Sequence, residues 1–167
     1  MIVFDSSTLI LVAKIELLEL FLDASKVAVA IPAEVERECC HTKKTFDSML
    51  IQKEIERSKI NVISVRNRTL VGRLQSDFSL GTGEAEALAL AMKEKADLFC
   101  TDDKTAINAC KVLGLPFTTA LAILIRSCEK RVICRDAAMS KLSLLARYGR
   151  YGNTIVGDAM SRLEAMR

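Results

Sequence analysis

Histidine and tryptophan are almost missing from this chain. It has 167 residues, with His41 as its single histidine and no tryptophan. With one histidine and no nucleophile-elbow motif, a Ser-His-Asp arrangement is poorly supported. Neither GxxxxGK[ST] nor GxGxxG occurs, which disfavours a P-loop or a dinucleotide-binding fold. The common routes to nucleophilic and nucleotide-cofactor chemistry are therefore weakly supported.

The cysteines lack the spacing of a metal site. Two are adjacent and the other four are scattered, with no CxxC pair: Cys39, Cys40, Cys100, Cys110, Cys128 and Cys134. Without such a pair and with one histidine, a zinc site is weakly supported. Most of these cysteines stand among apolar residues, so we expect small buried side chains in a reducing compartment.

Long apolar runs, proline, glycine and net charge are also scarce. No apolar run approaches the ~18 residues that span a bilayer, and the start MIVFD lacks the basic region of a signal peptide. Two prolines and seven glycines argue against a linker-rich or disordered chain. A formal net charge of +3 permits a nucleic-acid partner without requiring one. We expect a cytoplasmic protein with no membrane span.

Short β-branched segments alternate with helical patterns along the chain. Strands are predicted at 1–4, 26–31, 60–65, 97–101 and 115–118. Helices are predicted at 9–22 (with N-cap side chains from Ser6, Ser7 and Thr8), 32–40, 45–59, 70–78, 82–96 (after an N-cap at Thr82), 104–113, 119–128, 135–148 and 154–166. This order predicts an α/β fold of three layers, α/β/α, with a mainly parallel central sheet. We expect one domain over 1–130 and a C-terminal helical extension over 131–167 packed on it.

Acidic residues gather where predicted strands end and helices begin. In open parallel sheets the working residues collect at the carboxyl ends of the strands, a rule that selects Asp5, Asp102 and Asp103. Glutamates on two helices can reach the same edge: Glu34, Glu36, Glu38, Glu84 and Glu86. Carboxylates held close together repel one another unless they share protons or a cation. Oxygen ligands suit Mg²⁺ or Mn²⁺, which points to metal-assisted hydrolysis of a phosphodiester.

Each acid also has a structural explanation. Glu84 and Glu86 could interact with a helix dipole, worth roughly 0.3–1 kcal/mol each. One of Asp102 and Asp103 could cap the next helix. Asp5 is harder to explain in this way, because it directly follows a buried strand where an unpaired charge is costly.

Four segments in order resemble the motifs of PIN-domain ribonucleases. IVFDSSTLI is similar to the first motif, IPAEVERE to the second, LGTGEAEALALA to the third in its glutamate-bearing branch, and ADLFCTDDKTAINACKVLGL to the fourth. The resemblance extends over residues 1 to about 125 and is greatest to small prokaryotic proteins related to VapC toxins. The tail from about 132 to 167 resembles the helical extension of some members of that branch.

The resemblance implies a PIN-like fold and a metal-dependent endoribonuclease that hydrolyses RNA with a metal-bound water. The acids that match the catalytic quartet are Asp5, Glu38, Glu84 and Asp103. Ligands of Mg²⁺ or Mn²⁺ would come from Asp5, Glu84, Asp102 and Asp103, since Asp102 could replace or assist its neighbour. Ser7 and Thr101 match the supporting hydroxyl residues. By contrast, Glu86 points about 200° away from Glu84 on an α-helix and is expected to face solvent or the helix dipole.

The same resemblance suggests partners. RNA would be held through its phosphates, with candidate contacts at Lys43, Lys44 and Lys104 and further cations at Arg66, Arg68 and Arg73. An antitoxin protein and a homodimer are also implied. The alternative is a catalytically silent PIN-like module that binds RNA or protein.

Overall fold

The computed structural model describes residues 1–41 and 44–166. Within them, five parallel strands form one sheet in the order β3-β2-β1-β4-β5. The strands are β1 (Ile2–Phe4), β2 (Val29–Pro32), β3 (Ile60–Ile63), β4 (Leu98–Cys100) and β5 (Phe117–Thr118). The helices are α1 (Ser6–Lys14), α2 (Leu18–Ala24), α3 (Ala33–Glu36), α4 (Phe46–Glu56), α5 (Arg68–Phe78), α6 (Thr82–Lys93), α7 (Lys104–Leu113), α8 (Ala120–Glu129), α9 (Arg135–Tyr148) and α10 (Asn153–Glu164), with a π-helical turn η1 (Arg37–His41) after α3.

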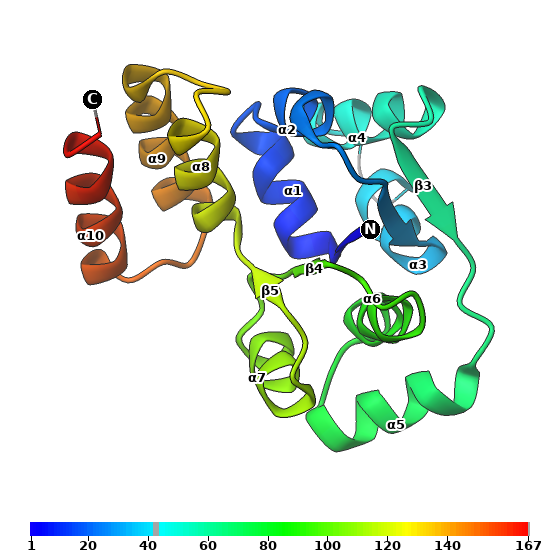
Figure 1. Ribbon diagram of the computed structural model, residues 1–167. Coiled ribbons are helices and arrows are strands. Elements are labelled where there is room, and N and C mark those ends of the chain that lie inside the picture. Colours follow the sequence, from blue (N-terminus) through cyan, green and yellow to red (C-terminus); the bar gives the residue numbers. More distant parts are fainter. Residues whose placement is uncertain (42–43, 167) are drawn as a thin grey trace.

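Helices cover both faces of the sheet. Figure 1 shows α1, α2 and α4 on one side of the strands and α5, α6 and α7 on the other. The predicted three-layer α/β/α architecture with a parallel sheet is therefore confirmed. The chain passes from β1 through β2 to β3 in one direction, and then returns to β4 on the other side of β1. The gap between the ends of β1 and β4 is thus a topological switch point, where ligands bind in open α/β sheets.

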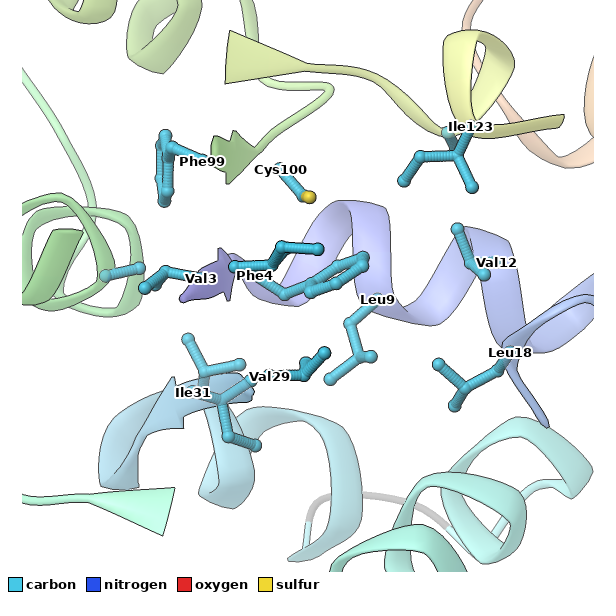
Figure 2. Packing of buried hydrophobic residues seen from close by; sticks show 14 of the residues in the cluster. Val3, Phe4, Leu9, Val12, Leu18, Val29, Ile31, Phe99, Cys100 and Ile123 are labelled. Carbon is cyan, nitrogen blue, oxygen red and sulfur yellow. The ribbon is translucent and has the colours of Figure 1, made fainter. Parts of the chain in front are cut away.

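The core lies around the central strand β1. All three of its residues are buried, and Phe4 is completely enclosed. Figure 2 shows Phe4 near the centre of the buried cluster, with Val29 of β2 and Leu9 of α1 below it in this view. The Phe4 ring also meets Phe21 of α2 edge to face, with ring centroids 5.6 Å apart. This packing fixes the residue that follows, Asp5, at the edge of the sheet.

The first helical segment differs from its predicted form. Residues 9–22 were expected to form one helix, whereas the structure has α1 and α2 with a break at Glu16, whose φ is +55°. The break lets Ile15 and Leu17, on either side of it, both be fully buried. The N-cap of α1 is also Asp5 rather than one of the hydroxyl residues after it, because the Asp5 carboxylate accepts the Thr8 N–H.

The C-terminal helices α9 and α10 lie beside α8 in Figure 1. The Lys141 ammonium of α9 donates to the Ile15 carbonyl at 2.7 Å, and Lys14 of α1 stands 5.4 Å above the Tyr148 ring. The extension is thus tied to the end of the first helix by a contact that spans 126 residues of the sequence. The boundary predicted at residue 130 stays a prediction. In the part of the chain that the structure covers, no helix is long and apolar enough to span a bilayer.

Candidate active site

Along with Glu54, Asp5 is one of the fully buried acids in the described part of the chain. Its side chain has no exposed surface and sits directly after β1. Both carboxylate oxygens are hydrogen bonded: Oδ1 accepts the Thr8 N–H at 2.9 Å, and Oδ2 accepts the Thr101 hydroxyl at 2.5 Å. The Ser7 hydroxyl lies 3.0 Å from both oxygens. Ser7, which was predicted to support Asp5, contacts it, and so does Thr101, the matching threonine of the fourth motif.

Burial sets the acidity of this group. It raises the pKa of Asp5 from 3.8 to about 7, and the nearby charge of Asp102 adds to the rise. The hydrogen bonds from Thr101, Thr8 and Ser7 favour the charged form and oppose the shift. Asp5 is thus poised to change its charge near neutral pH, which is typical of functional sites.

The two neighbouring aspartates after β4 have different contacts. Asp103 is the N-cap of α7, with Oδ1 accepting the N–H groups of Thr105 at 2.8 Å and Ala106 at 2.9 Å. Asp102 accepts the Thr8 hydroxyl and the Ala120 N–H, both at 2.8 Å, and the Tyr151 hydroxyl of the C-terminal extension. Hydrogen bonds therefore occupy both carboxylate oxygens of Asp102. This favours Asp103 as the acid of the fourth motif that is open to a ligand.

Glu84 stands in the first turn of α6 beside two other predicted acids. Burial raises its pKa, and the charges of Asp103 and Glu38 raise it further, so each of these two carboxylates is close enough to repel Glu84. Glu84 Oε2 also accepts the Gly81 N–H at 2.6 Å, which closes the start of its own helix. The structure thus places Glu84 within electrostatic reach of acids from two other motifs, Asp103 and Glu38.

A glycine makes the approach of Glu38 possible. Glu38 belongs to the π-helical turn η1, where the sequence predicted a continuous helix over 32–40. A Cβ atom built on Gly83 would lie 2.6 Å from both carboxylate oxygens of Glu38. Since real contacts of a Cβ are never that short, any larger residue at position 83 must displace the Glu38 carboxylate.

The acids do not form a ready-made coordination shell. Among residues 1–41 and 44–166, no three Asp, Glu, His or Cys side chains are arranged to hold a metal ion. The hydrogen bonds give a physical reason, because Glu84 is folded back onto Gly81 and Asp103 onto the start of α7. Metal binding by Asp5, Glu84, Asp102 and Asp103 therefore stays a prediction.

Glu86 does not face solvent as predicted. Only 4% of its surface is exposed, and it forms an ion pair with Arg68 of α5. Glu86 does point away from Glu84 around α6, as predicted. The face of α6 on which Glu86 lies, however, packs against α5. The prediction failed because the partner that stabilises this buried charge comes from another helix. Arg68, named as an RNA contact, has this structural role.

The cations predicted to contact RNA lie in different places. Lys104 is exposed at the start of α7, directly after Asp103, and Lys44 is exposed before α4. Lys43 lies outside the described residues. Of the three, Lys104 is therefore the one that the chain itself joins to the acidic edge.

Thr8 belongs to the candidate site, although the sequence predicted for it only a role in helix capping. Its N–H donates to Asp5 and its hydroxyl donates to Asp102, so one residue connects both motifs. The run of hydroxyl residues after Asp5 was the available signal, but the contact to Asp102 spans 94 residues.

The cysteines behave as expected: all six are free, and Cys39, Cys100, Cys110 and Cys128 are buried.

Comparison with known families agrees with this arrangement. A family model described as a PIN domain, DUF3368, matches residues 1–164. The chain therefore belongs to the PIN-domain family, whose members are generally nucleases that bind RNA and use divalent metals. The match includes the C-terminal helices as well as the sheet. No individual curated protein matches the chain significantly.

Proposed function

We propose that this protein is a metal-dependent endoribonuclease. The observation that carries the proposal is the buried Asp5 carboxylate, held by Ser7, Thr8 and Thr101 at the switch point of a PIN-domain sheet. Glu84 supports it, because the charges of Asp103 and Glu38 raise the pKa of its carboxyl group. Such mutual repulsion is costly for a folded protein, and a bound cation relieves it.

The chemistry of the donor set fits Mg²⁺ or Mn²⁺. Both ions bind carboxylate oxygens. The carboxylates proposed as ligands come from the four motifs of the family. Asp5, Glu84 and Asp103 would hold the ion, with Glu38 acting directly or through water. To do so, all three must share or release the hydrogen bonds that they now accept: those of Asp5 from Thr8, Thr101 and Ser7, and those of Glu84 and Asp103 from helix N–H groups. When bound, the ion supplies positive charge that stabilises the phosphate oxygens and activates water.

The protein groups supply the rest of the reaction. The three donors on Asp5 fix the position of its carboxylate, so its orientation requires no reorganisation during the reaction. Glu84, whose pKa is raised by burial, is suited to accept the proton of the attacking water. Lys104 stands next to Asp103, where it can contact a phosphate of the RNA.

Glu84→Gln tests the proposal. With Mn²⁺ or Mg²⁺ present, cleavage of single-stranded RNA should fall by at least about a hundredfold, because glutamine cannot take up the proton or hold the cation. Glutamine can still accept the Gly81 N–H, so the start of α6 remains capped. The matched control is Glu94→Gln, an exposed acid at the other end of the same helix, which should leave the rate unchanged.

Two outcomes would contradict the proposal. Equal cleavage by wild type and Glu84→Gln would assign the activity to a contaminant or to other residues. Binding of RNA without cleavage, with either metal, would favour the alternative of a catalytically silent PIN-like module.

We further propose a VapC-like toxin that acts in the cytoplasm as a homodimer and is restrained by an antitoxin protein. The resemblance of the four motifs to small prokaryotic PIN proteins related to VapC toxins supports the toxin role. The dimer is supported by two large apolar side chains exposed on α4, Phe46 at 63% and Met49 at 67%. Light scattering should give twice the mass of one chain, and Met49→Glu should shift the protein toward monomer. A monomeric wild type would rule out the dimer.

A further inference from the structure

The C-terminal extension forms one wall of a pocket on the acidic edge. The pocket has a volume of about 430 Å³ and opens between the start of α7, the start of α8 and the loop that joins α9 to α10. Its lining includes Asp102 and Asp103, and the loop contributes Arg150 and Tyr151. Pockets of this size hold small organic ligands in other proteins. A larger hollow of about 680 Å³ is lined by residues such as Phe21, Leu98 and Lys130 and by no acid.

A hydrogen bond from the extension keeps this wall in place. The half-buried Tyr151 donates its hydroxyl to Asp102 Oδ1, while Asp102 Oδ2 accepts from Thr8 and from the Ala120 N–H. Burial raises the pKa of Tyr151, and the charge of Asp102 raises it further, so the phenol stays a neutral donor at any physiological pH. Asp102 thereby joins α1, α8 and the extension at one point beside Asp103.

The sequence of the loop RYGRYGN fits this closure. A Cβ atom on Gly149 would lie 2.4 Å from Cε2 of Tyr151 and 2.9 Å from the Leu145 carbonyl oxygen. Only glycine therefore lets the Tyr151 ring turn back against the end of α9. The conformation brings the adjacent Arg150 to the mouth of the pocket.

The lining combines apolar walls with two cations. Leu11, Ile107, Leu121 and Ile155 supply the apolar surface, and Ile155 is 51% exposed at the opening. Lys104 and Arg150 supply positive charge, and both are exposed. Over the described part of the chain, neither cation takes part in an ion pair. A ligand that suits this lining has a flat, largely apolar body and an anionic group.

We propose that the pocket binds one nucleotide of the RNA next to the bond that is cleaved. The base lies against the apolar walls, and its phosphate contacts Lys104 and Arg150. The partly exposed opening lets the RNA chain continue on either side. This inference rests on the proposed function and deepens it, because it makes the extension part of the substrate site.

Arg150→Ala tests the inference with Arg147→Ala as its matched control. Arg147 is also exposed at the end of α9, but it does not line the pocket. A fluorescein-labelled RNA hexanucleotide is titrated with each protein in EDTA, so that binding is measured without cleavage. Arg150→Ala should weaken binding about tenfold, as the loss of a charge-assisted phosphate contact does, and Arg147→Ala less than about twofold. The slope of log affinity against log salt should also fall by about one for Arg150→Ala alone.

The cleavage assay with metal separates the two proposals. There Arg150→Ala should raise KM and leave kcat nearly unchanged, because the acids remain intact. If Arg150→Ala and Arg147→Ala bind the hexanucleotide equally, the pocket is not a nucleotide site, even when the wild type cleaves RNA. If Arg150→Ala alone loses binding and no protein cleaves RNA, the nucleotide site stands and the nuclease proposal fails.

Discussion

Replacing Asp5 by asparagine should abolish RNA cleavage and, in the metal-free protein, increase stability at pH 8. The loss of cleavage should be at least about a thousandfold, because asparagine cannot supply the charge that holds a cation at the switch point. The gain in stability follows from burial, which raises the pKa of Asp5 from 3.8 to about 7. The same residue would thus lower stability while it supports activity, as strained active sites do.

The direction of the pH effect follows from proton binding. Between about pH 4 and pH 7 the folded protein keeps a proton on Asp5 that the unfolded chain has released. The contribution of Asp5 to the free energy of unfolding of the wild type should therefore be highest near pH 4. It should fall as the pH rises to 7. Each pKa unit corresponds to about 1.4 kcal/mol, so the full effect is on the order of a few kcal/mol. Asparagine does not titrate, so the variant should lack this loss.

Asparagine can keep the local hydrogen bonds of Asp5. Its amide oxygen can accept the Thr8 N–H, and its amide nitrogen can donate to the Thr101 hydroxyl, which now lies 2.5 Å from the carboxylate. The difference in stability between variant and wild type should therefore reflect charge rather than lost contacts.

Urea unfolding in EDTA at pH 4, 6 and 8 measures the effect. The two proteins should differ little at pH 4, and the advantage of Asp5→Asn should grow toward pH 8. Asp97→Asn is a control with the opposite sign, because the N-terminal ammonium donates a hydrogen bond to this exposed carboxylate and lowers its pKa. Parallel stability curves for wild type and Asp5→Asn would show that Asp5 is not destabilised by its burial.

The site could be predicted in part because one rule of parallel sheets is purely local. A strand followed by an acid is visible in the sequence, and the rule that active residues follow strand ends located Asp5 and the pair Asp102-Asp103. The strand order was not predictable in this way, since it depends on which hydrophobic faces pack together. The break at Glu16 was also missed, because burial of Ile15 and Leu17 outweighs the cost of a positive φ there.

The contacts that were missed are long-range. Glu86 is buried because Arg68 of another helix pairs with it, and Tyr151 reaches Asp102 across 49 residues. No local periodicity encodes either contact. The glycines at 83 and 149 were visible, but their purpose depends on side chains that approach from elsewhere, Glu38 and Tyr151. Local patterns therefore predicted the acidic edge of the sheet, whereas the side-chain partners of these acids required the folded structure.

Gly83→Ala should lower cleavage without lowering stability. The added methyl group would overlap the Glu38 carboxylate, whose oxygens lie 2.6 Å from the position of its Cβ. The flexible end of Glu38 can move away, so the cost falls on the geometry of the site rather than on the fold. A shift of about 1 Å in a catalytic group can cost on the order of a hundredfold in rate, and we expect a loss of tenfold to a hundredfold. Alanine in a helix is also favoured over glycine by up to about 1 kcal/mol.

A second substitution identifies Glu38 as the cause. Glu38→Asp shortens the side chain by one methylene group and withdraws its carboxylate from the new methyl group. The double variant should therefore cleave RNA faster than the product of the two single effects predicts. Gly72→Ala is the control, because its added Cβ meets nothing within 4 Å on α5, and it should leave cleavage unchanged. If Gly83→Ala retains full activity, or if the two substitutions combine independently, contact between Gly83 and Glu38 does not position the acid for catalysis.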